Sequence, residues 1–159
     1  MSVLDKLPEV ANAVAELETA AALTRLSEHS RLRAVHLAHS AGLSQREIHA
    51  HLEASQSTIH RMLRTLAVNP TLLEETPAEV IDRRAAGLIT TEHMMAVLAD
   101  WKFTFGRVPV IDGAATDAYV SGTWDQVRQA YFQRRLTKEE FGELMTLNKA
   151  GLEEAVRSE

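Results

Sequence analysis

The sequence predicts an all-α protein, and three observations carry this prediction. Apolar residues recur at spacings of three and four along several segments, which is the period of a helix that packs one face inward. Seven glycines and four prolines in 159 residues favour helices over the many tight turns of a β-rich fold. Residue pairs typical of helix starts precede several apolar segments. We expect a helical bundle followed by a second, smaller helical domain.

Start and stop signals divide the first domain, expected over residues 1–70, into four helices. Gly42 suits the left-handed position that ends a helix, and Leu43 suits the apolar position after it. Ser44 and Glu47 form a capping box, in which each side chain satisfies a free backbone N–H, and Ser55 is an N-cap. The four helices are expected over residues 8–27, 30–41, 44–52 and 55–67.

A second domain, expected over residues 76–159, follows a linker of residues 68–75 that contains Asn69-Pro70. Capping boxes begin at Thr76 and Thr137, and Thr123 is expected to cap a further helix. Between them, the stretch KFTFGRVPVIDG alternates apolar residues around a glycine, which allows a short β-hairpin or an extended loop. Helices are expected over residues 76–86, 91–101 and 123–134, and from residue 137 to the C-terminus.

Composition excludes several classes of protein. The chain has no cysteine, which excludes a disulfide framework and a thiolate zinc site. Its first residues, MSVLDKLPEV, lack the pattern of a secretory signal, and no segment has 18 uninterrupted apolar residues. We therefore expect a cytoplasmic protein that does not enter a membrane.

Charge is unevenly distributed along the chain, whose net charge is −5. Residues 29–66 contain five arginines against two glutamates, whereas residues 71–159 contain ten Lys/Arg against fifteen Asp/Glu. The distribution of charge says more about nucleic-acid binding than its sum does. The positive segment includes the third and fourth expected helices, so nucleic-acid contacts are expected there.

The helix expected from Ser55 separates its residues into two faces. An apolar stripe at helical spacing is formed by Ile59, Met62, Leu63 and Leu66. The opposite face presents amide, hydroxyl, imidazole and guanidinium groups from Gln56, Ser57, His60, Arg61 and Arg64. Arginine can bond guanine through two donors, glutamine can do the same with adenine, and serine or histidine can reach bases or phosphates. A helix N-terminus also attracts phosphate.

These two helices resemble the helix-turn-helix of bacterial DNA-binding regulators. The resemblance rests on A-G-L-S-Q-R-E-I at residues 41–48, then Leu52, S-x-S-T-I at residues 55–59, and Arg61. It implies sequence-specific binding of double-stranded DNA by a transcriptional regulator, a repressor of its own operon or of other genes. The DNA-binding residues expected from it and from the face above are Ser44, Gln45, Arg46, Ser55, Gln56, Ser57, Thr58, His60, Arg61 and Arg64.

The sequence departs from this pattern at two places. His49 replaces the small residue usual inside the first of the two helices, and Glu53 replaces the glycine usual in the turn. A left-handed conformation at Glu53 would cost about 1 kcal/mol, so either that strain or a different turn is expected.

Other readings of the chain remain beside this one. His49 and His51, at i and i+2, diverge on a helix, and His36 and His39, at i and i+3, supply only two of the roughly four ligands that zinc needs, so we expect no metal site and no cofactor. Residues 76–159 show no catalytic pattern, so we expect no enzyme. The aromatic residues of that half form either a second core or a surface for a protein partner. An antitoxin that caps a toxin through residues 76–159 is the alternative function.

Dimerisation is expected because one such helix reads only a few base pairs. The stripe of Val10, Val14, Leu17 and Ala21 is either the interface of a homodimer or an internal packing face. A DNA-contacting wing formed by KFTFGR, with Arg107 at its tip, is a less favoured reading, because two expected helices separate it from the helix of Ser55.

Overall fold

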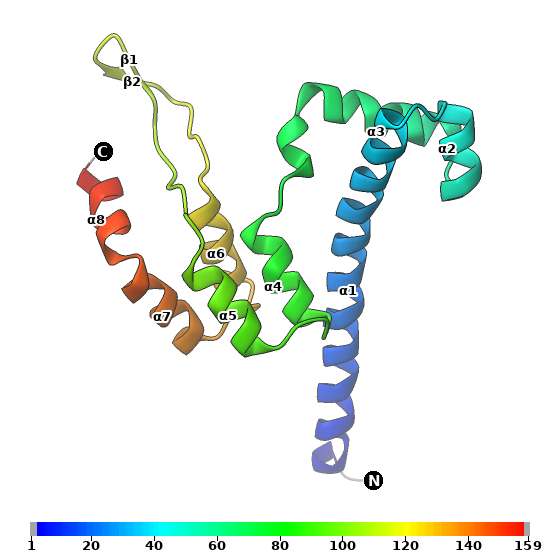
Figure 1. The fold of residues 1–159 in the computed structure, drawn as a ribbon. Coiled ribbons are helices and arrows are strands. Elements are labelled where there is room, and N and C mark those ends of the chain that lie inside the picture. Colours follow the sequence, from blue (N-terminus) through cyan, green and yellow to red (C-terminus); the bar gives the residue numbers. More distant parts are fainter. Residues whose placement is uncertain (1–2, 158–159) are drawn as a thin grey trace. The chain divides into compact units, whose positions relative to one another are not determined.

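The protein is helical, as expected, in a computed structural model that describes residues 3–157 (Figure 1). Among these residues, no helix is long and apolar enough to cross a membrane. The elements in chain order are α1 (Val3–Ser40), α2 (Gln45–Leu52), α3 (Gln56–Val68), the 3₁₀ helix η1 (Pro70–Leu73), α4 (Pro77–Ala85), α5 (Thr91–Ala99), β1 (Val110–Ile111), β2 (Ala114–Ala115), α6 (Thr123–Phe132), α7 (Lys138–Leu147) and α8 (Lys149–Arg157).

The chain divides into two compact units. One, here called the central unit, is Ala20–Glu75, and the other, the outer unit, combines the N-terminal segment up to Thr19 with Thr76–Glu159. Each unit has its own cluster of buried apolar side chains, and the two clusters share no residue. The two units are therefore described separately.

Residues 3–40 form one helix, where two were expected. Residues 27–30, Ser-Glu-His-Ser, can begin a helix but contain no glycine or proline to end one, so α1 continues through them. Pro8 lies inside α1 and does not begin it. At the other end the expectation holds. Gly42 has φ +99°, and the N–H groups of Gly42 and Leu43 donate to His39 O and Ala38 O, which closes the helix as a Schellman turn.

The core of the central unit fixes α1, α2 and α3 together. Val35, Ile48, Ala54 and Ile59 are buried, with Ala38, Leu43, Leu52, Met62 and Leu63 packed around them. The segment expected to be a linker is partly ordered as η1, which contacts α3. Arg33 holds this segment by donating from Nε to Leu73 O at 3.0 Å and from Nη2 to Glu74 O at 3.1 Å.

Helices α4 to α7 of the outer unit surround a core that contains most of the aromatic residues. Trp124 is 3% exposed and contacts Phe103, Phe105 and Phe141, with ring centroids 5.1 to 6.2 Å apart. Gly87, in the turn between α4 and α5, and Arg134, in the turn between α6 and α7, both have positive φ. Trp101, Tyr131 and the three phenylalanines that contact Trp124 pack against the same buried cluster, so these aromatic residues form a second core.

A short β-hairpin projects between α5 and α6, one of the two structures allowed by the sequence (Figure 1). Val110 pairs with Ala115, and Asp112 and Gly113 form the turn with positive φ at both residues. The expected cap of α6 is wrong by one residue: Gly122 is the N-cap, and its N–H donates to Asp125 Oδ2. Thr123 instead forms reciprocal hydrogen bonds with Thr104 at the base of the hairpin.

The end of the chain also differs from expectation, because the helix that begins after Thr137 stops at Leu147. Asn148 interrupts it, and its side-chain amide donates to Leu144 O at 2.8 Å. A separate helix, α8, then begins at Lys149.

Glu140 is expected to stabilise the outer unit by about 2 kcal/mol, as hydrogen bonds to charged groups do. Its carboxylate is 11% exposed and accepts from Arg84 Nη1 at 2.8 Å and from Thr137 N at 2.8 Å. Burial raises the pKa of Glu140, but the hydrogen bonds from Arg84 and Thr137 outweigh it and hold the pKa below the usual 4.5. The stabilisation is therefore complete above pH 4.5 and is lost as the pH falls through the lower pKa of the folded state.

Glu140→Gln should lower the free energy of unfolding at neutral pH and reduce its acid dependence below pH 4.5. Urea unfolding followed by tryptophan fluorescence at several pH values measures both effects. The neighbouring exposed residue supplies the control, Glu139→Gln. Equal stability of the two variants at neutral pH would contradict the assigned role.

Candidate DNA-binding site

The site begins with two well-capped helices joined by a short turn. Ser44 Oγ accepts from Glu47 N, and Glu47 Oε2 accepts from Ser44 N at 2.7 Å, so the expected capping box is present. The hydrogen bonds from the backbone and the hydroxyl of Ser44 lower the pKa of Glu47. Ser55 caps α3 by accepting from Thr58 N at 3.1 Å. Both helices therefore begin after the capping residues that were predicted from the sequence, Ser44 and Ser55.

The turn between α2 and α3 contains the two residues that depart from the usual pattern. Glu53 has φ +57° and ψ +34°, so the chain keeps the left-handed turn and a non-glycine residue adopts it. His49 Nδ1 bonds Ala54 O across the turn, with the proton on the ring nitrogen because the carbonyl can only accept. The imidazole therefore ties α2 to Ala54, which precedes the N-cap residue of α3, a role that a small side chain could not perform.

Replacing Glu53 by glycine is expected to stabilise the central unit by about 1 kcal/mol, because glycine adopts positive φ without a steric penalty. Glu53 is exposed, so its side chain contributes little packing. The free energy of unfolding from urea titration, followed by far-ultraviolet circular dichroism, measures the change. Glu74→Gly is the matched control: Glu74 is also exposed, but its φ is −74°, so glycine should destabilise there. A loss of stability in Glu53→Gly would contradict the assignment of strain.

Helix α3 presents the face that the sequence predicted. Ile59 and Leu66 are buried, at 0% and 6% exposure, and fix the rotation of the helix. Gln56, Ser57, His60, Arg61 and Arg64 are all exposed, and α3 contains no carboxylate. Arg61 Nη2 lies 3.5 Å from Thr58 Oγ1, a long hydrogen bond that leaves most donors of the guanidinium available. The exposed residues form one polar and basic surface, here called the α3 face.

The remaining predicted residues border this face in different ways. Arg46 is exposed at the start of α2, and Gln45 is half-buried. Ser44 and Ser55 use their hydroxyl oxygens as helix caps, and Thr58 is half-buried with its Oγ1 2.7 Å from Ser55 Oγ. Their first role is structural, and what they retain for a ligand is hydroxyl and backbone groups at two helix N-termini.

A hollow of about 620 Å³ lies beside the α3 face and was not predicted from the sequence. Ser57, His60, Arg61 and Arg64 line it from α3, and Leu72 lines it from η1. Because this hollow separates η1 from part of α3, Arg64 remains exposed even though η1 contacts α3. Arg33, one of the five arginines of the positive segment at residues 29–66, instead uses its guanidinium to hold the backbone of residues 73 and 74.

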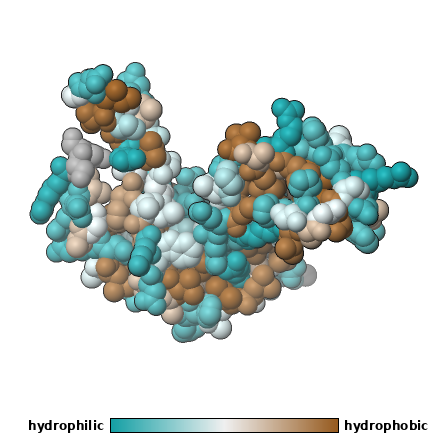
Figure 2. All heavy atoms as spheres, turned by 45° about the horizontal axis from the view of Figure 1, so that its top comes forward, coloured by the Kyte–Doolittle hydropathy of each residue, from teal (hydrophilic) through white to brown (hydrophobic). Residues whose placement is uncertain are grey.

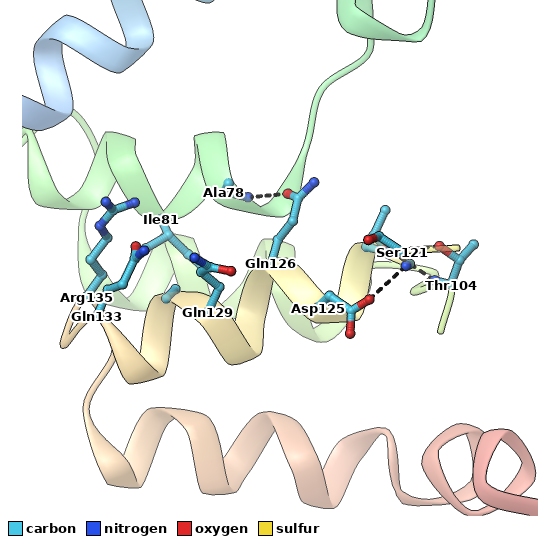
Figure 3. A pocket seen from close by; sticks show the side chains of 12 residues that line it. Ala78, Ile81, Thr104, Ser121, Asp125, Gln126, Gln129, Gln133 and Arg135 are labelled. Atoms are coloured by element: carbon cyan, nitrogen blue, oxygen red, sulfur yellow. Dashed lines mark hydrogen bonds between the residues drawn. The ribbon is translucent and has the colours of Figure 1, made fainter. Parts of the chain in front are cut away.

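A second cavity, of about 380 Å³, lies between α4 and α6 in the outer unit (Figure 3). Its polar groups already serve the fold: Gln126 Oε1 accepts from Ala78 N at 3.0 Å, and Asp125 caps α6. Arg135 Nη1 lies 3.9 Å from Asp82 Oδ1. Within the part of the chain that the structure describes, no group of three His, Asp or Glu residues could hold a metal.

The geometry of α2, the turn and α3 defines the class: a helix-turn-helix DNA-binding protein, as found among bacterial transcription regulators. Comparison with known families specifies the type. Residues 36–69 match the IclR helix-turn-helix domain, and this match spans the end of α1, α2, the turn and α3. No curated protein and no solved structure matches the chain. Residues 36–69 of the central unit are therefore similar to the DNA-binding domain of IclR-type regulators.

Proposed function

We propose that the protein is a transcriptional repressor that reads a short operator through the α3 face. The observation that carries the proposal is this face: five exposed polar or basic side chains on a helix without carboxylates, oriented by the buried Ile59 and Leu66. Arg61 and Arg64 supply donors to base edges, and Gln56 and Ser57 stand at the N-terminal turn, the part of a recognition helix that approaches bases.

Groups outside α3 are proposed to hold the DNA backbone. Arg46, at the start of α2, offers a positive charge, and the N-termini of α2 and α3 offer partial positive charge to phosphates. Ser44, Gln45, Ser55 and Thr58 lie at these two N-termini and contribute short-range polar contacts. Such contacts position the protein, whereas base contacts give it sequence specificity.

Autorepression is the specific form of regulation proposed. The test is binding to the duplex immediately upstream of the protein's own coding sequence, followed by fluorescence anisotropy, with a shuffled duplex of equal composition as the control. Preference for the upstream duplex, together with lower expression of a reporter placed behind it, is expected. Binding with equal affinity to both duplexes would contradict autorepression while leaving DNA binding intact.

The second candidate function is capture of a protein partner, such as a toxin, by residues 76–159. The observation that favours it is the hairpin, whose apolar residues are exposed: Val110 by 64%, Ile111 by 62% and Val120 by 43% (Figure 2). Exposed apolar residues that gather on a surface mark interaction sites.

The antitoxin function predicts a partner whose expression alone arrests growth and whose effect the wild-type chain reverses. Val110→Ser/Ile111→Thr should lose this reversal and keep DNA binding, because the changes lie outside the central unit. If that variant relieves the growth arrest as fully as the wild type does, the hairpin does not bind the partner.

A further inference from the structure

The N-terminal half of α1 packs against little of the chain that the structure describes. Every residue from Lys6 to Glu18 is exposed. A helical segment of this length is marginal in water, and most helices in proteins are stabilised by packing an apolar face. Figure 1 shows the first turns of α1 standing clear of the other helices of the outer unit. This segment needs a packing partner.

The two sides of this segment differ in polarity, and the polar side is the one used within the outer unit. Thr19 Oγ1 donates to Ala85 O at the end of α4, and a hollow on the same side is lined by Asn12, Ala15, Glu16 and Thr19. The opposite side carries Leu7, Val10, Val14 and Leu17, which are exposed by 55%, 57%, 47% and 70%. These four residues, here called the α1 seam, face away from the contact with α4.

We propose that the α1 seam binds the α1 seam of a second copy of this chain. Its residues follow one another at spacings of three, four and three, the heptad spacing of a two-helix coiled coil. The order Leu-Val-Val-Leu reads the same in both directions, so two copies match leucine with leucine and valine with valine in either orientation. Such self-complementarity is what a two-fold interface requires.

The charges of the segment are compatible with pairing of two copies. Glu9 and Glu16 lie outside the seam, where their carboxylates stay in water, and Ala21 continues the seam. The positions that border the seam hold alanines 11, 13 and 20 together with Lys6 and Glu18. Two copies therefore meet through apolar side chains, with one basic and one acidic residue at the edge of each copy. A heterologous partner of opposite charge would need acidic or basic residues within the seam, and it has none.

The area available sets the strength of this dimer. Two heptads of paired helices bury on the order of 1,000 Å² in total, which is at the lower limit for a specific interface. The seam therefore supports a reversible, concentration-dependent dimer. If the proposed function holds, on which this use of the dimer rests, adjacent half-sites on DNA complete the dimer by raising the local concentration of the second copy.

Sedimentation equilibrium of the full chain without DNA tests the proposal. The wild-type mass should rise from 17.6 kDa toward twice that value as the concentration increases. Val10→Glu/Leu17→Glu should remain at 17.6 kDa throughout and should stay folded, because both residues are more than half exposed. Asn12→Glu/Ala15→Glu adds the same charge on the opposite side and should dimerise as the wild type does.

Cysteine cross-linking gives a second measurement that keeps the seam apolar. The chain has no cysteine, so Leu7→Cys/Leu17→Cys introduces the only two thiols. Mild oxidation should form a covalent dimer in either helix orientation, because residue 7 then meets residue 7 or residue 17 of the other copy. Glu9→Cys/Glu16→Cys, outside the seam, should not form one.

Dimerisation of the glutamate variant equal to that of the wild type would overturn the proposal, and so would a wild-type chain that stays monomeric both alone and on DNA. Failure of the proposed function would give a different result. The seam variants would change the mass and the cross-linking as described above, but the wild type would bind all duplexes with equal affinity. With both correct, Val10→Glu/Leu17→Glu should lose about tenfold or more in affinity for a two-fold symmetric site and little for a single half-site.

Discussion

Replacing both Arg61 and Arg64 by alanine is expected to weaken operator binding by about 100-fold or more. Each arginine that bonds a base through two donors contributes about 1 to 3 kcal/mol, and 1.4 kcal/mol corresponds to a factor of ten. Arg61→Ala alone should cost about 1 to 3 kcal/mol and relax specificity at one position of the operator. Both arginines are exposed, so the fold should be unchanged. Fluorescence anisotropy at fixed salt measures the loss.

The salt dependence separates the two roles that an arginine can have. If both arginines contact phosphates, the slope of log K against log salt should fall by about 0.9 for each, whereas base contacts leave it nearly constant. Lys102→Ala/Arg128→Ala removes two exposed positive charges from the outer unit and serves as the control. Arg107→Ala tests the hairpin as a DNA wing, and we expect it to bind normally. Equal affinity of the Arg61/Arg64 double variant and the wild type would mean that the α3 face is not the reading surface.

Trp124→Ala is expected to destabilise the outer unit by about 3 to 5 kcal/mol, the usual cost of truncating a buried aromatic residue. Trp124 is 3% exposed and lies against three phenylalanine rings. Binding to a single half-site should be spared, because the buried cluster of the central unit shares no residue with that of the outer unit.

The two tryptophans make this experiment specific. Trp101 also packs against the core of the outer unit, so its fluorescence in Trp124→Ala reports on that unit alone, while anisotropy reports on DNA binding. Phe132→Ala, at a side chain that is 70% exposed, is the control. Loss of half-site binding under the conditions in which Trp101 shows the outer unit unfolded would contradict the independence of the two units. The expected domain boundaries, 1–70 and 76–159, stay a prediction until that measurement.

Local chemistry made much of the helix-turn-helix predictable. Ser44 with Glu47, and Ser55, satisfy free N–H groups within four residues, so their hydrogen bonds can be inferred from the sequence. Gly42 is equally local, because the left-handed turn needs little beyond its own backbone. The face of α3 followed from helical spacing, since Ile59 and Leu66 had to be buried.

What the sequence did not reveal depends on residues far apart in the chain or on missing signals. The hydrogen bonds from Arg33 to residues 73 and 74 join segments 40 residues apart, and they turned an expected linker into an ordered border of the α3 face. The serines at 27 and 30 resembled a helix boundary, but nothing there ends a helix. Thr123 resembled an N-cap in the sequence, but its hydroxyl oxygen accepts a hydrogen bond from the backbone N–H of Thr104, which lies 19 residues away.

Selection from random duplex DNA at near-physiological salt measures directly whether the α3 face reads DNA sequence. The wild type and Arg61→Ala/Arg64→Ala are selected side by side from the same pool, with circular dichroism confirming that both are folded. We expect the wild type to enrich a short, two-fold symmetric site and the double variant to enrich none. A folded wild type that enriches no sequence, or a double variant that enriches the same site, would contradict this expectation.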